Sequence, residues 1–96
     1  MAEYRLSPAA VRDLEAIWTY SAQQWGIEQA DKYIDALTAA FDELAHSPNM
    51  APACDHIRSS YRRWVVERHN VYFLVMHYGI AIIRVLHDRM DAPRHL

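Results

Sequence analysis

The chain has 96 residues, 52% of them hydrophobic, a length and composition that predict one domain over residues 1–96 and exclude an intrinsically disordered chain. Its single cysteine, Cys54, cannot form an intramolecular disulfide, which excludes a small secreted disulfide scaffold. The net charge of -2 is unevenly distributed: three basic and eight acidic residues give residues 1–50 a charge of -5, whereas seven arginines and four acidic residues give residues 51–96 a charge of +3. This asymmetry predicts a face for a charged partner, or simply solvated acidic helices beside an arginine-bearing sheet.

The first half of the chain is predicted to form a short strand and two helices. Residues 3–6 alternate between polar and apolar side chains, as in a strand. Ser7 is a typical helix N-cap, and Pro8 is typical of the first position of a helix. The helix is expected to end at Gly26, and a second one to end near His46, before Pro48. Each carries an apolar stripe, formed by Val11, Leu14, Trp18, Ala22 and Trp25 in the first and by Ala30, Tyr33, Ile34, Leu37, Ala40, Phe41 and Leu44 in the second.

The second half of the chain changes from a helical period to an alternation of period two. Strands are expected over 61–68, 71–78 and 80–87, with Asn70 and Gly79 as the breaks between them. These three strands predict an antiparallel meander, which the first strand must join because an isolated strand is unstable. The sequence therefore predicts an α+β fold of order β-α-α-β-β-β, with a helical hairpin packed on an antiparallel sheet.

The sequence offers no recognisable site for a metal or cofactor. The six histidines are scattered, the two glycines form no phosphate-binding loop, and Cys54 is interpreted as an incidental thiol rather than a nucleophile. We therefore expect no cofactor. With no apolar run of roughly 18 residues and no secretory leader, the expected location is cytoplasmic.

The aromatic residues have a structural interpretation. Trp18 and Trp25 lie on the stripe of the first helix and are expected in the core rather than as anchors for a partner. Trp64 is expected to be buried against the helices.

The arginines of the second half predict a basic face and rim on the sheet, because arginine presents a planar set of donors suited to carboxylates and phosphates. Arg84 lies in the middle of an apolar strand and needs a partner or access to water. His87 follows it and is interpreted as a structural histidine in preference to a general acid or base.

The chain resembles the ParE toxins of bacterial toxin–antitoxin modules, within the wider RelE/ParE superfamily, in three stretches: YRLSPAAVRDLEAIWTYSAQQWG, IRSSYRRWVVERHNVYFLV and IIRVLHDRMDAPRHL. The resemblance implies the RelE/ParE-like fold, a role in plasmid stabilization, a ParD-like antitoxin whose C-terminal arm wraps over the toxin, and DNA gyrase as the poisoned target. It implies no catalysis by the toxin itself, no membrane and no sequence-specific nucleic-acid binding.

RelE-type relatives on the same fold instead cut mRNA on the ribosome. A net charge of -2 argues against a protein that works inside the ribosome, because neutralisation of phosphates dominates RNA affinity. Gyrase poisoning is therefore preferred, and ribosome-dependent RNA cleavage is kept as the alternative.

The site predicted from the sequence has two parts. The face that meets gyrase or its DNA is assigned to Arg62, Arg63, Arg84, His87, Arg89, Arg94 and His95. The contacts with the antitoxin are assigned to Ile17, Tyr20 and Trp64. The tail could instead bind back onto the core, with Arg89 paired to Asp91 or to an acidic helix.

Overall fold

The predicted elements are present, in the predicted order, in the computed structural model, which describes residues 2–96. Ser7 caps the first helix as expected, since its hydroxyl oxygen accepts a hydrogen bond from the amide of Ala10 at 3.0 Å. The elements are β1 (Glu3–Leu6), α1 (Pro8–Trp25), α2 (Ile27–His46), the 3₁₀ turn η1 (Pro48–Met50), β2 (Arg62–Val66), β3 (His69–Met76), β4 (Gly79–His87) and α3 (Ala92–His95).

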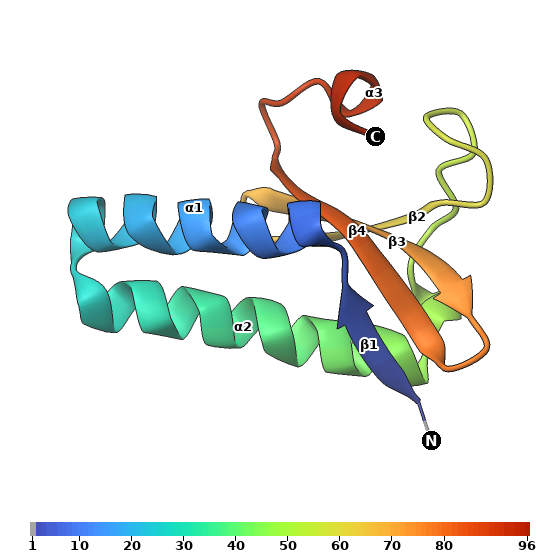
Figure 1. Cartoon of the computed structure of the whole chain (residues 1–96), viewed down its shortest axis with the longest axis horizontal. Helices are drawn as coiled ribbons and strands as arrows, with labels where there is room; N and C mark the ends of the chain where they lie inside the picture. Colours follow the sequence, from blue (N-terminus) through green and yellow to red (C-terminus); the bar gives the residue numbers. More distant parts are fainter. Residues whose placement is uncertain (1) are drawn as a thin grey trace.

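The four strands form one sheet in the order β1-β4-β3-β2, with the helical hairpin α1–α2 on one face (Figure 1). The α+β class and the antiparallel meander β2-β3-β4 are confirmed. The sheet as a whole is mixed, because β1 lies parallel to β4. Alternation along a strand gives its two faces and carries no information on its direction.

Two strand boundaries differ from the prediction. Asn70 lies inside β3, and the turn before it is formed by Glu67 and Arg68. Glu67 has a φ of 53°, a left-handed conformation that the composition of the segment did not indicate. Gly79 begins β4 instead of forming the turn. A Cβ atom at this glycine would lie 2.0 Å from the carbonyl oxygen of Glu3 on β1, so the strand pair needs glycine here.

The main core lies between the hairpin and the sheet, and the buried face of α1 is rotated from the predicted stripe. Ala10, Ile17 and Ser21 are buried, whereas Val11 is exposed. Small side chains at positions 10 and 21 allow α1 to approach its neighbours closely, and this outweighs the larger apolar surface of the predicted stripe. From α2, Leu37, Phe41 and Leu44 are completely buried in the core, as expected, each at 0% exposure.

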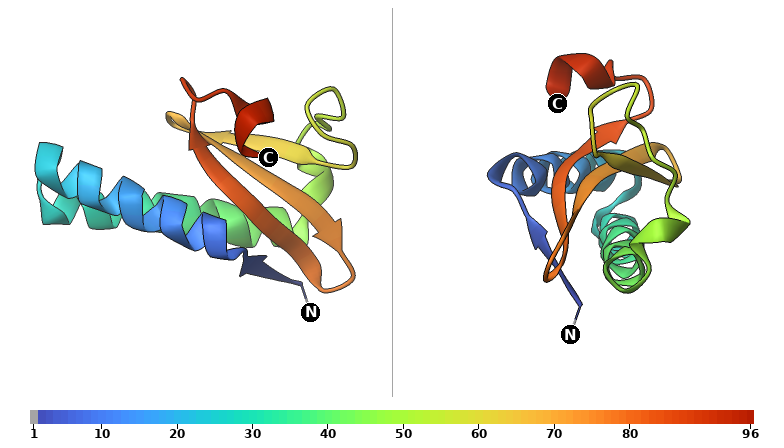
Figure 2. Two further views of the ribbon diagram at one scale, coloured as in Figure 1. Left: turned by 45° about the horizontal axis from the view of Figure 1, so that its top comes forward. Right: turned by 90° about the vertical axis from the view of Figure 1, so that its right-hand side faces the viewer.

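The helical hairpin is longer than the sheet it covers. Its α1–α2 turn projects past the sheet in two different views (Figures 1 and 2). Side chains near that turn therefore have no sheet beneath them. Trp25, predicted to be in the core, is 65% exposed for this reason.

Candidate functional site

Residues 88–96, called the tail below, return over the face of the sheet opposite the hairpin (Figure 2). Ala92 and the partly buried Leu96 pack on Tyr72, Leu86 and Cys54, which form a cluster separate from the main core. The tail is thus anchored by a small apolar contact of its own. Arg94, and not Arg89, pairs with Asp91, with Nε and Oδ2 3.4 Å apart.

Arg84 is the link between helix α1 and the tail. Its guanidinium donates two hydrogen bonds of 2.8 Å to the carboxylate of Asp13 and a third, of 3.0 Å, to the carbonyl oxygen of His95. The bond to Asp13 raises the pKa of Arg84. The expectation that a mid-strand arginine needs a partner is confirmed, and its donors are committed within the molecule. Arg84 therefore holds the tail in place instead of presenting a free cation.

Asp13 also accepts a hydrogen bond from the edge of β4 that β1 leaves uncovered. β1 covers β4 only as far as Ile82. Beyond it, the Ser7 hydroxyl donates to the carbonyl of Ile83 at 2.6 Å, and a carboxylate oxygen of Asp13 accepts from the amide of Val85 at 2.9 Å. Side chains of the first helix thus replace the missing strand partner. Nothing in the sequence around Asp13 indicated this role, since its partners are more than 70 positions away.

The two neighbouring arginines of β2 face opposite sides of the sheet. Arg62 lies on the helical side and donates to the carbonyl oxygen of Ala51 at 2.6 Å, which ties down the loop before β2. Arg63 lies on the other side, opposite Tyr72, and lines a shallow hollow with Pro52 and Val65. Of the two, only Arg63 is placed on the same face as the tail.

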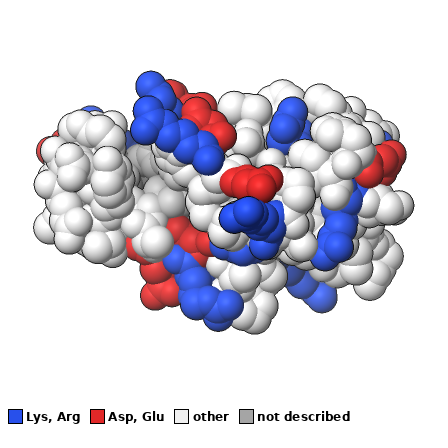
Figure 3. All heavy atoms as spheres, turned by 90° about the horizontal axis from the view of Figure 1, so that it is seen from above, with Lys and Arg blue, Asp and Glu red and all other residues white. Residues whose placement is uncertain are grey.

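Exposed basic side chains lie on the tail itself and beside it. We call the four exposed side chains there the basic tail face, which consists of Arg58, Arg89, Arg94 and His95. Arg58 was not in the predicted set, and its guanidinium donates to the carbonyl oxygen of Leu96 at 2.7 Å. Seen from above, basic side chains are spread over the middle and right of the molecule with acidic ones between them, whereas the left end, at the α1–α2 turn, is almost uncharged (Figure 3).

Two histidines meet where the tail leaves the sheet. His69 and His87 are cross-strand partners, with ring centroids 5.3 Å apart in an edge-to-face arrangement. The hydroxyl of Tyr33, from α2, lies 2.6 Å from Nδ1 of His69. Burial, and then the neighbouring His87, lower the pKa of His69, so it is neutral at pH 7. The expected structural role of His87 fits this packing.

The residues predicted to contact an antitoxin are found in different environments. Ile17 is in the core, at 9% exposure, and the prediction that it is a surface contact is wrong, because the buried face of α1 is rotated toward it. Trp64 is partly buried against the main core, as the structural interpretation expected. Tyr20 is exposed and packs edge to face on Trp25, with ring centroids 6.1 Å apart.

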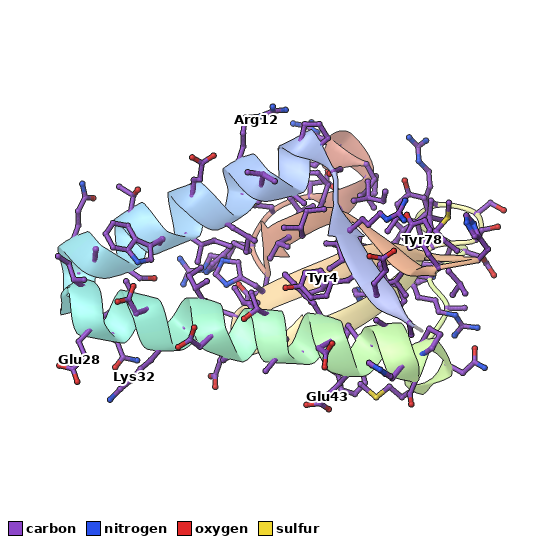
Figure 4. All side chains as sticks on the ribbon, turned by 60° about the horizontal axis from the view of Figure 1, so that its bottom comes forward. Tyr4, Arg12, Glu28, Lys32, Glu43 and Tyr78 are labelled. Atoms are coloured by element: carbon purple, nitrogen blue, oxygen red, sulfur yellow. The ribbon has the colours of Figure 1, made fainter. Side chains whose placement is uncertain are left out.

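Tyr20, Trp25 and Ile27 form what we call the tip patch, and each is at least 58% exposed. Trp25 and Ile27 were not predicted as exposed contacts. A usable signal was present, since residues 16–27 contain no charged side chain. Charged side chains begin again at the start of α2: Glu28 projects outward (Figure 4) and lies 3.9 Å from Nζ of Lys32, and Asp31 accepts a hydrogen bond from the indole of Trp18 at 2.8 Å.

Residues 2–96 contain no group of three acidic, histidine or cysteine side chains that could hold a metal ion. Burial raises the pKa of the Cys54 thiol, which makes it a poor nucleophile. Within the described residues, no helix is long and apolar enough to cross a membrane.

Comparison with known proteins gives the family. Residues 4–92 match the family model described as "ParE toxin of type II toxin-antitoxin system, parDE". The chain belongs to the ParE toxin family. It is 43% identical over 94 residues to Toxin ParE1 of Mycobacterium tuberculosis, covering 97% of this chain and 96% of the relative. It is 44% identical over 96 residues to Toxin ParE1 of Caulobacter vibrioides, covering 100% and 99%.

A solved structure supports the fold of this ParE-family chain. The chromosomal ParDE toxin–antitoxin system from P. aeruginosa aligns with a TM-score of 0.78 over 91% of this chain and 96% of that one. At 21% sequence identity, the likeness concerns the fold alone. The RelE/ParE-like fold and the ParE-type toxin class predicted from the sequence are both confirmed.

Proposed function

We propose that this ParE-family toxin poisons DNA gyrase by binding, without catalysing a reaction itself, and that a ParD-like antitoxin neutralises it. The observation that carries the proposal is the basic tail face. Three of its exposed basic side chains belong to the tail and the fourth, Arg58, lies beside it, and the tail is fixed to the sheet by packing and by hydrogen bonds from two arginines. Such a face fits acidic protein surfaces or the phosphates of DNA held by gyrase.

The rigidity of the tail supports binding as the mode of action. Arg84 and Arg58 donate hydrogen bonds to main-chain oxygens of His95 and Leu96, so the tail is ordered before it meets a partner. Preorganisation reduces the entropy lost on association. In this proposal Arg84 and Arg62 position the surface, and the basic tail face, joined by Arg63 on the same side of the sheet, makes the contacts.

The tip patch is the proposed contact for the antitoxin. It is apolar, exposed and at the opposite end of the molecule from the tail (Figure 1), so it fits a partner segment that presents apolar side chains. The strand β2 lies at the edge of the sheet and has a neighbouring strand on one side only. Together with Trp64, it offers a second contact for an extended arm of the antitoxin.

The test is a supercoiling assay with purified gyrase, ATP and plasmid. The protein is expected to reduce supercoiling and to accumulate linear DNA, and the cognate antitoxin is expected to relieve both effects. The double variant Arg89→Ala/Arg94→Ala should weaken inhibition at least about tenfold, because each arginine would lose charged hydrogen bonds. Arg12→Ala is the matched control, since Arg12 projects from the outer side of α1 (Figure 4).

Inhibition that is equal for the double variant and the control would refute the role of the basic tail face. If gyrase were unaffected while translating ribosomes showed new mRNA cleavage, the proposal would be wrong and the RelE-like activity right.

A further inference from the structure

We propose that the tail is a latch, which lifts off the sheet without unfolding of the domain, and that Asp13 of α1 controls how often it opens. The carboxylate of Asp13 bonds to β4 and not to the tail, so it acts through Arg84. Asp13 is thus a positioning residue for the basic tail face. Its bearing on toxicity rests on the proposed function, whereas the latch itself is a property of the isolated toxin.

The carboxylate of Asp13 fixes the plane of the Arg84 guanidinium. Its two oxygens accept from Nε and Nη2 at 2.8 Å each, the paired geometry that holds an arginine in one orientation. The third nitrogen, Nη1, lies 3.0 Å from the carbonyl oxygen of His95 on the tail. Asp13 is itself held, because Oδ2 also accepts from the amide of Val85 at 2.9 Å. Helix α1 therefore directs the donor that holds the end of the tail.

Few bonds join the tail to the rest of the molecule. At its root, the amide of Asp88 donates to a carbonyl oxygen of the β2–β3 turn at 2.8 Å. Beyond Asp88, the main-chain hydrogen bonds of the tail stay within residues 87–96 in the part of the chain that the structure describes. Two guanidinium groups reach it from outside, those of Arg84 and Arg58. A segment held in this way opens at a smaller cost in free energy than the whole domain unfolds.

The apolar contact beneath the tail is small, and it covers the single thiol of the chain. Ala92 and the partly buried Leu96 pack on a cluster that includes Cys54 and is separate from the main core. Cys54 is only 2% exposed. Lifting of the tail therefore uncovers this thiol, while the core between the hairpin and the sheet stays intact.

Opening of the latch also takes apart the basic tail face. Three of its four side chains, Arg89, Arg94 and His95, belong to the tail and leave the sheet with it. A partner that needs the closed arrangement binds in proportion to the fraction of closed molecules. By orienting Arg84, Asp13 sets that fraction.

The experiment is labelling of Cys54 in the full chain at pH 8 with an aromatic disulfide reagent, in the absence of gyrase. Asp13→Asn should raise the labelling rate about tenfold, because the amide offers one acceptor oxygen in place of two and charged hydrogen bonds are lost. Arg84→Lys should raise it to a similar extent, since it keeps the charge opposite Asp13 but has no planar set of donors. Glu15→Gln, at an exposed carboxylate of the same helix, is the control that should label at the wild-type rate.

Urea distinguishes opening of the latch from unfolding of the domain. Opening exposes little surface, so the rate of labelling should change little in urea well below the unfolding transition, whereas labelling through global unfolding rises steeply. The proposal is overturned if Asp13→Asn and Arg84→Lys label at the wild-type rate, or if their faster labelling rises steeply with urea. Should Asp13→Asn fail to fold, Arg84→Lys gives the same test.

Gyrase separates this inference from the proposed function. Variants that label fast and also inhibit gyrase less would support both. If they label fast and inhibit gyrase as the wild type does, the latch stands and the role given to the basic tail face is wrong.

Discussion

The two ends of this molecule are built on opposite principles. At the sheet end, charges are numerous and many are tied down: Arg84 joins helix α1 to the tail, and Arg62 and Arg58 bind backbone carbonyls. At the hairpin tip, twelve consecutive residues carry no charge, and three large side chains are exposed. The difference shows that a domain of 96 residues can carry two surfaces of unlike chemistry, one polar and held by hydrogen bonds, the other apolar.

The glycines of the two ends should differ most in their tolerance of substitution. Gly79→Ala would drive a Cβ atom into the backbone of β1, 2.0 Å from the Glu3 carbonyl oxygen. We expect a loss of at least about 3 kcal/mol in the free energy of unfolding, measured by urea denaturation. Gly26, at the tip, has φ of 94° and open space around it, so Gly26→Ala should cost only about 1 to 2 kcal/mol of backbone strain. Equal losses would contradict the contrast.

The second prediction concerns the link between α1 and the tail. Asp13→Asn removes the charge that pairs with Arg84, whose side chain is only 20% exposed. The variant should lose about 2 to 3 kcal/mol of stability, because a largely enclosed guanidinium is left without its counter-ion. Urea denaturation of Asp13→Asn, Arg84→Met and the double variant forms a thermodynamic cycle. Strictly additive losses would show that the pair contributes nothing.

The third prediction is that acid lowers the free energy of unfolding through a residue of the sheet end, His69, and not through the tip. Because burial lowers the pKa of His69, the unfolded chain binds a proton that the folded chain resists. The free energy of unfolding should therefore fall as pH decreases below about 6.5, the usual histidine value, and should be independent of this residue above it. His69→Gln should flatten the decline, whereas His56→Gln, in an exposed loop, should not. A decline of the same slope in both variants would assign it elsewhere.

The smallest effect on stability is expected at the tip. Trp25→Ser should change the free energy of unfolding by less than about 0.5 kcal/mol, because the indole is 65% exposed. Its affinity for the antitoxin, measured by calorimetry, should nevertheless fall at least about thirtyfold, as for an interface anchor. Val75→Ser, an exposed apolar position of the sheet end, should retain the affinity. The tip patch is not the antitoxin contact if Trp25→Ser binds normally.

The fold was largely predictable because its signals are local. Ser7 and Pro8 mark the start of α1, and the stripe of α2 is filled by residues that are indeed buried, such as Leu37 and Phe41. Which of two overlapping apolar stripes on α1 is buried is not decided by local sequence signals. Ile17 is buried because α1 is rotated toward it, and Trp25 is exposed because the sheet ends before the helix does; both depend on how the layers are placed.

The site was predictable only in part, for a similar reason. Sequence pattern identified Arg84 as a residue in need of a partner, and an acidic residue 71 positions earlier supplies it. The alternation of the strand already placed Arg62 and Arg63 on opposite faces of the sheet, as observed, but it could not tell which of the two faces the tail would cover. Exposure near the tail, which distinguishes Arg89 and Arg94 from Arg84, is set by the path of the tail across the sheet.

The parallel pairing of β1 with β4 has a consequence for synthesis on the ribosome. In a nascent chain that has emerged from the ribosome only as far as β3, β1 has no strand to pair with. Arg84, the partner of Asp13, has not yet been made either. The pairings that complete the sheet join positions separated by about 76 residues, and such distant contacts form late and slowly. The platform on which the tail rests thus cannot exist before β4 has been made. A chain that ends before β4 therefore has no basic tail face to present.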